Sequence, residues 1–364
     1  MYKGILVFYI NAIHEGGAER VIIQVAKHFA ESGYRSILVT SFVDENEYEV
    51  PAGVERIVLE EKHLKMGKIR RNIGRIIALR KVCKKYKPNA IISFMAEPNM
   101  RAIIANIGLK TKKIVSVRND PNKEYAGLLG KIVGKFILPM AEGCVFQTEE
   151  AKKWFPISLQ KKSRVIFNDV DHIFFETEYV GGNDIVTLGR LCNQKNHKLL
   201  IDAFMKISNK HKDTNLLIYG IGPLEKKIKE YISSCNMDSR IFLKGLTSES
   251  NVVLSQARCF ALSSDYEGMP NALLEALAIG VPSISTDCPC GGPHMLIKNQ
   301  VNGLLVPVND VDALADALDY MLSNPDRATE IGISAREMAE CYSTEKVFLE
   351  WKTYVESIVF GSFR

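Results

Sequence analysis

The chain lacks any long apolar run. Its longest N-terminal apolar stretch, Ile5 to Ile10, has the length of a strand, whereas a helix needs about 18 to 20 apolar residues to cross a bilayer. That stretch also lacks the layout of a signal peptide, because polar residues follow it where a small-residue cleavage site would stand. We therefore expect a cytoplasmic protein.

The chain also lacks a paired pattern of cysteines. Its eight cysteines are scattered along 364 residues, and no Cys-x-x-Cys spacing occurs. A disulfide framework or a structural zinc site would need such pairs, so we interpret the cysteines as reduced thiols. Internal repeats and low-complexity tracts are absent as well, which argues against a solenoid.

Acids are missing from one stretch of the chain, between Lys62 and Lys87. This stretch holds seven Lys and four Arg residues, so the other 36 basic residues face all 42 Asp and Glu residues. The positive charge of the protein is therefore local and requires a local explanation.

What is present is an alternation of short apolar runs and helical patterns, which predicts parallel sheets covered by helices on both faces. A length of 364 residues fits two α/β domains of roughly 150 to 200 residues each. In the first half we expect strands at 4–10, 35–40, 89–94, 113–117, 143–146 and 163–167. Helices are expected between them at 18–31, 68–86, 97–107, 123–138 and 148–154.

The pattern restarts in the second half and predicts a second doubly wound unit. Strands are expected at 184–188, 214–219, 240–243, 258–262, 282–285 and 303–306. Helices are expected at 196–208, 223–235, 249–256, 270–279, 310–322 and 325–340.

The domain boundary is expected at a stretch without apolar periodicity, Phe175 to Asn183, which we interpret as a linker. The predicted domains are therefore residues 1–175 and 176–342. The remaining segment, 343–364, has apolar residues at helical spacing, including Trp351 and Tyr354. We expect it to form a helix that packs back on the first domain.

The strongest motif runs from Ser263 to Asn271 and continues to Glu275. Glu267 and Glu275 are eight residues apart, one after a predicted strand and one two turns into a predicted helix. Unpaired N–H groups at the start of that helix favour a diphosphate. Carboxylates repel phosphate, so we expect both acids to accept hydrogen bonds from sugar or ribose hydroxyls. A capped helix with two surface acids is the alternative.

Spacing and sequence together resemble a known family. The segment Glu267 to Glu275 resembles the EX7E motif of retaining glycosyltransferases of family 4, which have the GT-B fold of two Rossmann-like domains with parallel sheets facing across a cleft. Other matching segments follow in order: Gly16-Gly17-Ala18-Glu19-Arg20, Asn168 with Asp171, Gly189-Arg190 with Lys195-Asn196, Gly220-Ile221-Gly222 and Asn302-Gly303-Leu304-Leu305-Val306. The resemblance covers nearly the whole chain.

This resemblance implies an acceptor-binding first domain and a nucleotide-sugar-binding second domain. It implies that Arg190 and Lys195 hold the donor diphosphate and that Glu267 contacts the transferred sugar; these three are the expected catalytic residues. Glu275 is expected to bind the ribose. The expected donor-binding residues are Gly16, Gly17, Gly189, Gly220, Gly268, Met269, Pro270, Asn271 and Glu275. The family retains anomeric configuration and implies no metal and no cofactor.

One position departs from the usual motifs of the family, and one further pattern resembles a metal site. Many relatives have a histidine after the strand that ends at Val117, where this chain has Arg118. That arginine is either a hydrogen-bond donor to a substrate or an ordinary loop residue. Metal-dependent transferases use an Asp-x-Asp pair, which occurs at Asp169 and again at Asp310. The second pair begins a predicted helix as its N-cap, so we discount both.

The acid-free stretch points to the acceptor. Its apolar residues Ile69, Ile73, Ile76 and Ile77 share one helical face and are expected to dock on the first sheet. Its cations, which include Lys68, Arg70, Arg71 and Arg75, are expected to attract an anionic membrane surface or an acceptor diphosphate. No aromatic interleaving supports nucleic acid as a partner.

Within the family the chain most resembles N-acetylgalactosaminyltransferases that extend polyprenyl-diphosphate-linked glycans. This implies a UDP-sugar donor, an N-acetylhexosamine first, and a peripheral enzyme on the inner face of the cell membrane. A transferase acting on a soluble acceptor, a sugar-nucleotide epimerase of the same fold and a non-catalytic sugar-nucleotide-binding module remain as alternatives. A nicotinamide-dependent dehydrogenase is disfavoured, because no glycine-rich turn has the spacing that such enzymes use.

Overall fold

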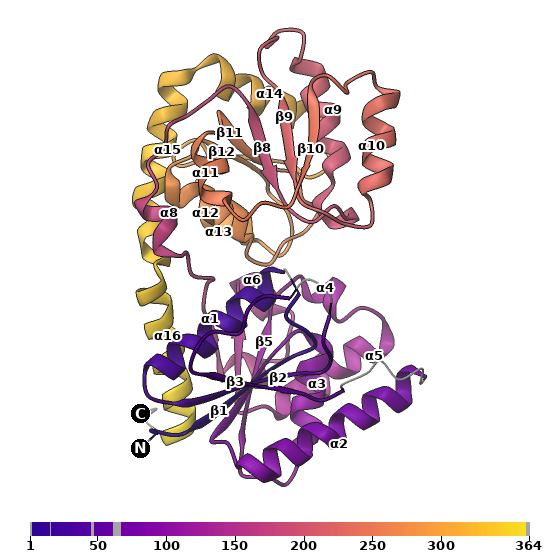
Figure 1. The fold of residues 1–364 in the computed structure, drawn as a ribbon, viewed down its shortest axis with the longest axis vertical. Helices are drawn as coiled ribbons and strands as arrows, with labels where there is room; N and C mark the ends of the chain where they lie inside the picture. Colours follow the sequence, from indigo (N-terminus) through magenta and orange to yellow (C-terminus); the bar gives the residue numbers. More distant parts are fainter. Residues whose placement is uncertain (1, 15, 45–46, 61–66, 362–364) are drawn as a thin grey trace. The chain divides into compact units, whose positions relative to one another are not determined.

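The computed structural model describes residues 2–14, 16–44, 47–60 and 67–361, with the side chain of Lys68 left out. The chain divides into two compact units. The first comprises residues 1–168 and 345–364, and the second comprises residues 169–344. Each unit is built around its own parallel sheet (Figure 1).

The first sheet has seven parallel strands in the order β3-β2-β1-β4-β5-β6-β7. The strands are β1 (Ile5–Ile10), β2 (Arg35–Thr40), β3 (Val54–Val58), β4 (Ala90–Phe94), β5 (Lys112–Val117), β6 (Gly143–Phe146) and β7 (Ser163–Val165). Six of these were predicted close to their observed positions. The edge strand β3 was missed because its five residues are all only partly buried and form no continuous apolar run.

Successive residues of β1 point to opposite faces of this sheet, as strand geometry requires. Leu6 and Phe8 join the core beneath α1 (Gly17–Glu31) and α16 (Thr344–Phe360). Val7 and Tyr9 join the core beneath α2 (Lys68–Tyr86) and α3 (Ala96–Ala105). In the first core, the fully buried ring of Trp351 stacks on Phe94 with ring centroids 5.8 Å apart. The final helix is therefore a core element of the first unit.

Helix α2 begins and ends where the sequence predicted, but of the four isoleucines expected to dock on the sheet only Ile76 packs against the core. Ile69, Ile73 and Ile77 are 78%, 53% and 52% exposed. The face that packs inward instead carries Arg75, Leu79 and Cys83. Both sets repeat every four residues, so helical spacing alone does not tell which one meets the sheet.

The segment predicted as one helix at 123–138 is a series of short turns. It comprises α4 (Pro121–Glu124), α5 (Gly127–Ile132), the π-helical η1 (Val133–Ile137) and the 3-10 helix η2 (Leu138–Met140). Gly127 has φ of +73°, which interrupts the helix before α5. The helices α6 (Glu149–Lys153) and α7 (Ile157–Gln160) follow.

The second sheet has six parallel strands in the order β10-β9-β8-β11-β12-β13. Its strands are β8 (Ile185–Leu188), β9 (Leu216–Tyr219), β10 (Ile241–Gly245), β11 (Cys259–Leu262), β12 (Ser283–Thr286) and β13 (Leu304–Val306). Its helices are α8 (His172–Glu176), α9 (His197–Ile207), α10 (Glu225–Ser234), α11 (Ser250–Ser255), α12 (Asn271–Ile279), α13 (Gly292–Leu296), α14 (Val311–Ser323) and α15 (Pro325–Ala339). This strand order is that of a doubly wound sheet.

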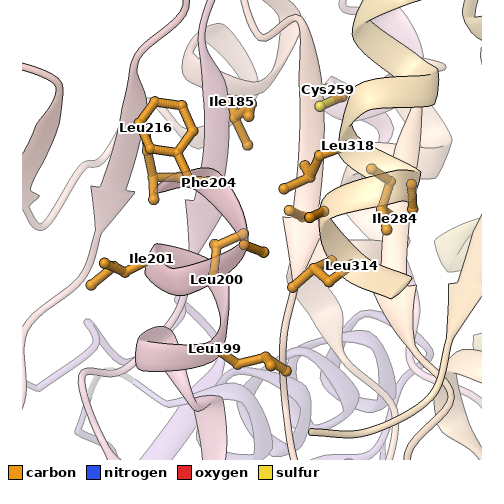
Figure 2. Close-up of a cluster of buried hydrophobic side chains, with 14 of the residues drawn as sticks. Ile185, Leu199, Leu200, Ile201, Phe204, Leu216, Cys259, Ile284, Leu314 and Leu318 are labelled. Atoms are coloured by element: carbon orange, nitrogen blue, oxygen red, sulfur yellow. The ribbon is translucent and has the colours of Figure 1, made fainter. Parts of the chain in front are cut away.

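One core of the second unit lies beneath α9 and α14 (Figure 2). Leu200 and Phe204 of α9 face Leu314 and Leu318 of α14, and all four side chains are fully buried. The apolar periodicity of both helices placed these residues on one face, and the structure packs that face on the sheet.

The predicted linker belongs to the second unit. The backbone N–H groups of Val180 and Gly181 both donate to the carbonyl of Ser255, and the Tyr179 hydroxyl donates to the carbonyl of Arg258. The boundary falls after Asn168, seven residues before the predicted one. Residues 175–183 are attached to the second unit by hydrogen bonds and not by an apolar face. For this reason they show no apolar periodicity.

Candidate functional site

The second sheet reverses its strand order between β8 and β11. These two strands pair directly, while β9 and β10 extend the sheet on one side and β12 and β13 on the other. In such sheets a ligand binds outside the carboxyl ends of the strands at the point of reversal. The loops after β8 and β11 carry most of the residues that the sequence singled out.

Glycines allow the loops after β8 and β9 to meet. The N–H of Gly189 donates to the carbonyl of Tyr219 over 3.0 Å. Gly220 has φ of +136°, and a Cβ atom there would lie 2.0 Å from the carbonyl oxygen of Gly189. A Cβ atom at Gly189 would lie 3.1 Å from Cε of Lys195. Because Gly189 and Gly220 have no Cβ atom, the loops after β8 and β9 and the Lys195 side chain can lie close together.

A buried ion pair joins the two loops. Nζ of Lys195 lies 2.6 Å from Oε1 of Glu267, whose side chain is 7% exposed. The Ser264 hydroxyl donates to the same oxygen over 2.7 Å, and the Gln194 amide donates to Oε2 over 3.3 Å. Three groups therefore donate to the two oxygens of this carboxylate. Sequence analysis did not assign Ser264 or Gln194 to the site, although Gln194 adjoins Lys195 and Ser264 lies within the motif that contains Glu267.

Backbone contacts fix this ion pair in place. The Ser263 hydroxyl donates to the carbonyl of Lys195 over 2.9 Å, and the N–H of Asp265 donates to the carbonyl of Gln194 over 2.8 Å. Asn196, in the left-handed region with φ of 42°, accepts a bond from Leu199 as the N-cap of α9. The geometry of Lys195 and Glu267 is therefore set by the fold and not by the ion pair alone.

Arg190 differs from Lys195. It lies directly after Gly189 on the loop that follows β8, and its residue is exposed. Within the described parts of the chain, its guanidinium has no hydrogen-bond or ion-pair partner. A planar cation in this position can bind the oxygens of a phosphate in a bidentate manner.

The start of α12 contains the second half of the motif. Pro270 is its N-cap and Asn271 its first residue, so the proline lies one position earlier than expected. Met269 and Glu275 are 6% and 5% exposed. Gly292 permits close approach here, because a Cβ atom would lie 1.7 Å from the carbonyl oxygen of Gly268. The carboxylate of Glu275 is thus buried near the N-terminal turn of a helix, not on the surface.

Two neighbouring groups have shifted pKa values. Burial lowers the pKa of His197, at the start of α9, to about 4, and the charge of Lys195 adds to this effect. Burial raises the pKa of Cys288 to about 12, with a further contribution from the charge of Glu267. Both groups are neutral near pH 7, so neither adds a charge beside the ion pair and Arg190.

Both Asp-x-Asp pairs have structural partners. Asp310 accepts from the N–H of Ala313 over 2.9 Å, which confirms the predicted N-cap. Asp171 caps α8 by accepting from Ile173, and Asp169 accepts from the Thr344 hydroxyl over 3.0 Å. No cluster of three or more potential metal ligands occurs in the described residues.

In the first unit, the glycine turn after β1 leads into α1. Gly16 is the N-cap and Gly17 the first residue of the helix. A Cβ atom at Gly16 would lie 2.3 Å from Oε2 of Glu19. The other carboxylate oxygen of Glu19, Oε1, lies 3.2 Å from Nε2 of His14. A helix N-terminus at the carboxyl end of a parallel strand suits a phosphate, and a role of Gly16 and Gly17 in donor binding stays a prediction.

Arg118 is a buried residue and not an exposed loop arginine. It is 6% exposed, its guanidinium donates to Oδ1 of Asn168, and it lies 4.6 Å from the ring centroid of Phe94. Burial raises the pKa of the nearby Glu124 to about 7, against the opposing effects of backbone N–H groups and of Arg118. Sequence analysis did not predict this carboxyl, whose burial depends on the fold.

The cations of α2 do not act as one set. Arg75 is buried and forms two hydrogen bonds with Glu60, of 2.9 and 3.0 Å, so the prediction that it faces an acceptor or a membrane is wrong. Arg70 is exposed and Arg71 is partly buried. The side chain of Lys68 and residues 62–66 lie outside the described residues. Among the described helices, none has the length and apolarity needed to span a bilayer.

Two family models match adjoining parts of the chain. A model described as Glycosyltransferase Family 4 matches residues 15–174, and one described as Glycosyl transferases group 1 matches residues 169–338. Together they cover both units apart from α16 and the extreme N-terminus.

Similar proteins match the chain over nearly its whole length. One from Campylobacter jejuni, the GalNAc-alpha-(1->4)-GalNAc-alpha-(1->3)-diNAcBac-PP-undecaprenol alpha-1,4-N-acetyl-D-galactosaminyltransferase, is 25% identical over 358 residues, 96% of this chain and 98% of the relative. Another, the N-acetylgalactosamine-N,N'-diacetylbacillosaminyl-diphospho-undecaprenol 4-alpha-N-acetylgalactosaminyltransferase of the same organism, is 25% identical over 364 residues, 93% of this chain and 96% of the relative. The Anabaena protein HepE, solved in complex with UDP and glucose, superposes with a TM-score of 0.83 at 15% identity, over 97% of this chain and 100% of HepE.

Proposed function

Because this chain belongs to the glycosyltransferases with the GT-B fold, we propose that it transfers an N-acetylhexosamine from a UDP-sugar to a polyprenyl-diphosphate-linked glycan. The predicted α/β class and two Rossmann-like domains are confirmed by the sheets and by the structural neighbours. The names of the two Campylobacter relatives support the choice of sugar and of acceptor.

The observation that carries the proposal is the ion pair of Lys195 and Glu267 beside the exposed Arg190, at the strand-order reversal of the second sheet. The two cations together can neutralise a diphosphate. Glu267 holds the Lys195 ammonium in place, and two of its three N–H groups remain for phosphate oxygens. Preorganised charge of this kind stabilises a departing UDP without reorganisation during the reaction.

In the proposed reaction the bond between the anomeric carbon and the UDP oxygen breaks, and an acceptor hydroxyl forms a bond on the same face. The hydroxyl proton passes to the departing phosphate oxygen, so the anomeric configuration is retained. Arg190 and Lys195 take the place of a metal ion in balancing the developing negative charge. The enzyme is then metal-independent and requires no dedicated protein base.

The remaining donor contacts follow from position. Glu275, near the start of α12, accepts hydrogen bonds from the ribose hydroxyls, and backbone groups from Gly268 to Asn271 contact the sugar and phosphates. We further propose that the protein acts on the cytoplasmic face of the membrane, where the exposed cations of α2 attract anionic lipid or the acceptor diphosphate.

A donor screen tests the first half of this proposal. Nucleotide sugars are added one at a time, and the thermal unfolding temperature is measured; a ligand at 100 times its Kd adds about 2.7 kcal/mol of stability. We expect the largest shift with UDP-N-acetylhexosamines, and an unchanged shift when EDTA is present. A larger shift with a nucleotide sugar of another base would contradict the choice of UDP.

A transfer assay tests the second half. The best donor is incubated with a short-chain polyprenyl-diphosphate glycan, and the product linkage is determined by NMR. We expect an axial anomeric bond, as in the α-linked donor. A sugar-nucleotide epimerase would instead interconvert the donor sugar without any acceptor, so the acceptor-free control separates the two activities.

A further inference from the structure

The first unit carries an unpartnered apolar stripe on the segment from α5 to η2. The stripe consists of five exposed residues: Leu128, Leu129, Ile132, Phe136 and Met140. In this order, they are 76%, 78%, 40%, 71% and 50% exposed. Four of them repeat every fourth residue, the spacing of one helical face. An exposed apolar patch of this kind on a soluble unit usually marks a binding surface.

The other side of the same segment is firmly packed. A Cβ atom at Gly134 would lie 2.6 Å from the Trp154 ring, and Leu138 is fully buried. The Trp154 ring itself is held by a 2.9 Å hydrogen bond from Nε1 to Asn122. The segment is therefore attached to the unit by one face, and the stripe is the face that points to solvent.

A second exposed stripe, Ile69, Ile73 and Ile77, lies on α2. Helix α3 packs against α2 and also against η1 and η2, so one helix supports both stripes within the first unit (Figure 1).

The two segments that carry the stripes contain basic but no acidic residues. Residues 67–87 and 125–140 contain no Asp or Glu. Arg70, Lys81, Lys84 and Lys85 are exposed on α2, and Lys131 is exposed on α5. A second copy of this chain seated on the same surface would bring cations against cations, whereas an anionic bilayer complements them.

We propose that the stripe from Leu128 to Met140 inserts into the interfacial region of an anionic bilayer, with the cations of α5 and α2 at the headgroups. An interfacial segment of this type combines an apolar face with Lys and Arg residues and lies in the plane of the membrane. The purpose of this surface rests on the proposed function, because an acceptor with a polyprenyl tail remains in the membrane. The binding itself does not depend on which sugar is transferred.

Vesicle flotation of the full chain tests the proposal. Vesicles of phosphatidylglycerol and phosphatidylethanolamine are compared with vesicles of phosphatidylcholine alone. We expect binding to the anionic vesicles, and at least a tenfold loss of affinity in the triple variant Leu128→Ser, Leu129→Ser, Phe136→Ser. The matched control, Val180→Ser, Ile333→Ser, Met338→Ser, removes three exposed apolar residues of the second unit and should bind as the native chain does.

Two further measurements make the outcome decisive. The unfolding temperature of the triple variant should equal that of the native chain, and its turnover on a water-soluble short-chain acceptor should be unchanged. Failure of the proposed function would appear as lost donor binding with vesicle affinity intact. The insertion proposal is overturned by native affinity in the triple variant, by absence of vesicle binding in the native chain, or by a dimer in solution that the triple substitution dissociates.

Discussion

A buried carboxyl side chain near the carboxyl end of one sheet has different surroundings from one near the carboxyl end of the other. In the second unit, the carboxylate of Glu267 receives an ammonium and two side-chain hydrogen bonds. In the first unit, the carboxyl of Glu124 is dominated by burial, and its pKa rises to about 7 although Arg118 lies near. The second unit thus surrounds its buried carboxylate with hydrogen-bond donors, whereas the first unit holds a carboxyl whose pKa is raised toward neutral pH by burial.

The largest effect should come from removing the ammonium beside Glu267. Lys195→Ala should lower kcat by about two to three orders of magnitude, the usual scale for losing one preorganised charge stabiliser. The matched control is Lys198→Ala, because Lys198 lies on the same loop-helix junction, is 63% exposed and pairs with Asp202. Initial rates at saturating donor measure both.

The same substitution leaves Glu267 buried without its ammonium, which could unfold the loop instead of slowing the reaction. The double variant Lys195→Met, Glu267→Gln separates these effects, since it restores neutrality. We expect native-like thermal stability and low turnover. Near-native turnover in Lys195→Ala would show that the ion pair has only a structural role.

A second comparison concerns the glycines of the two units. Gly220→Ala should lower the free energy of unfolding by about 3 kcal/mol or more, because φ of +136° is unfavourable for alanine and the new Cβ would meet backbone. Gly16→Ala should cost about 1 kcal/mol or less, since its new Cβ meets only the carboxylate end of the Glu19 side chain. Urea unfolding of both variants measures the difference. Equal losses would mean that the Glu19 side chain cannot move.

The remaining effects should appear in the dependence of stability on pH, each within a limited pH range. The raised pKa of Glu124 means that its contribution is fully present below pH 4.5 and is lost as pH rises through about 7. The lowered pKa of His197 means that its contribution is present above pH 6.5 and is lost as pH falls through about 4. Each shift corresponds to about 3 kcal/mol across its pH range.

Substitution separates the two limbs of that profile. Glu124→Gln should flatten the loss of stability between pH 5 and 8, and His197→Leu should flatten the loss between pH 6 and 4. Glu149→Gln is the control, because the Glu149 side chain is 58% exposed. Chemical unfolding at each pH gives the curves, and an unchanged alkaline limb in Glu124→Gln would contradict the burial of that carboxyl.

Most of the fold could be predicted because apolar runs and helical spacing are local properties. Bounds of α2 and of most strands came directly from them. The face of α2 could not be predicted, because Arg75 is buried only through its bond to Glu60, fifteen residues away in the chain. A basic side chain indicates solvent unless its partner is known, and pairing across a fold is not a local property.

The candidate site, like the fold, could be predicted only in part from local sequence patterns. Lys195 and Glu267 were predicted as site residues through motif resemblance, yet their direct contact was not foreseen, since 72 residues separate them in the chain. Ser264 and Gln194 became recognisable only once both loops were placed. No sequence pattern pointed to Glu124, because its pKa depends on burial beside α3 and β5.

The path of the chain has a consequence for synthesis. The polypeptide leaves the first unit at Asn168 and returns to it at Glu345, and Trp351 then fills the core beside Phe94. Nascent chains that have emerged only as far as the second unit therefore carry all seven strands of the first sheet, but one face of that sheet still lacks the side chains of α16. We expect the second unit to become protease-resistant first on the ribosome, and truncation before α16 to expose the first unit to chaperones.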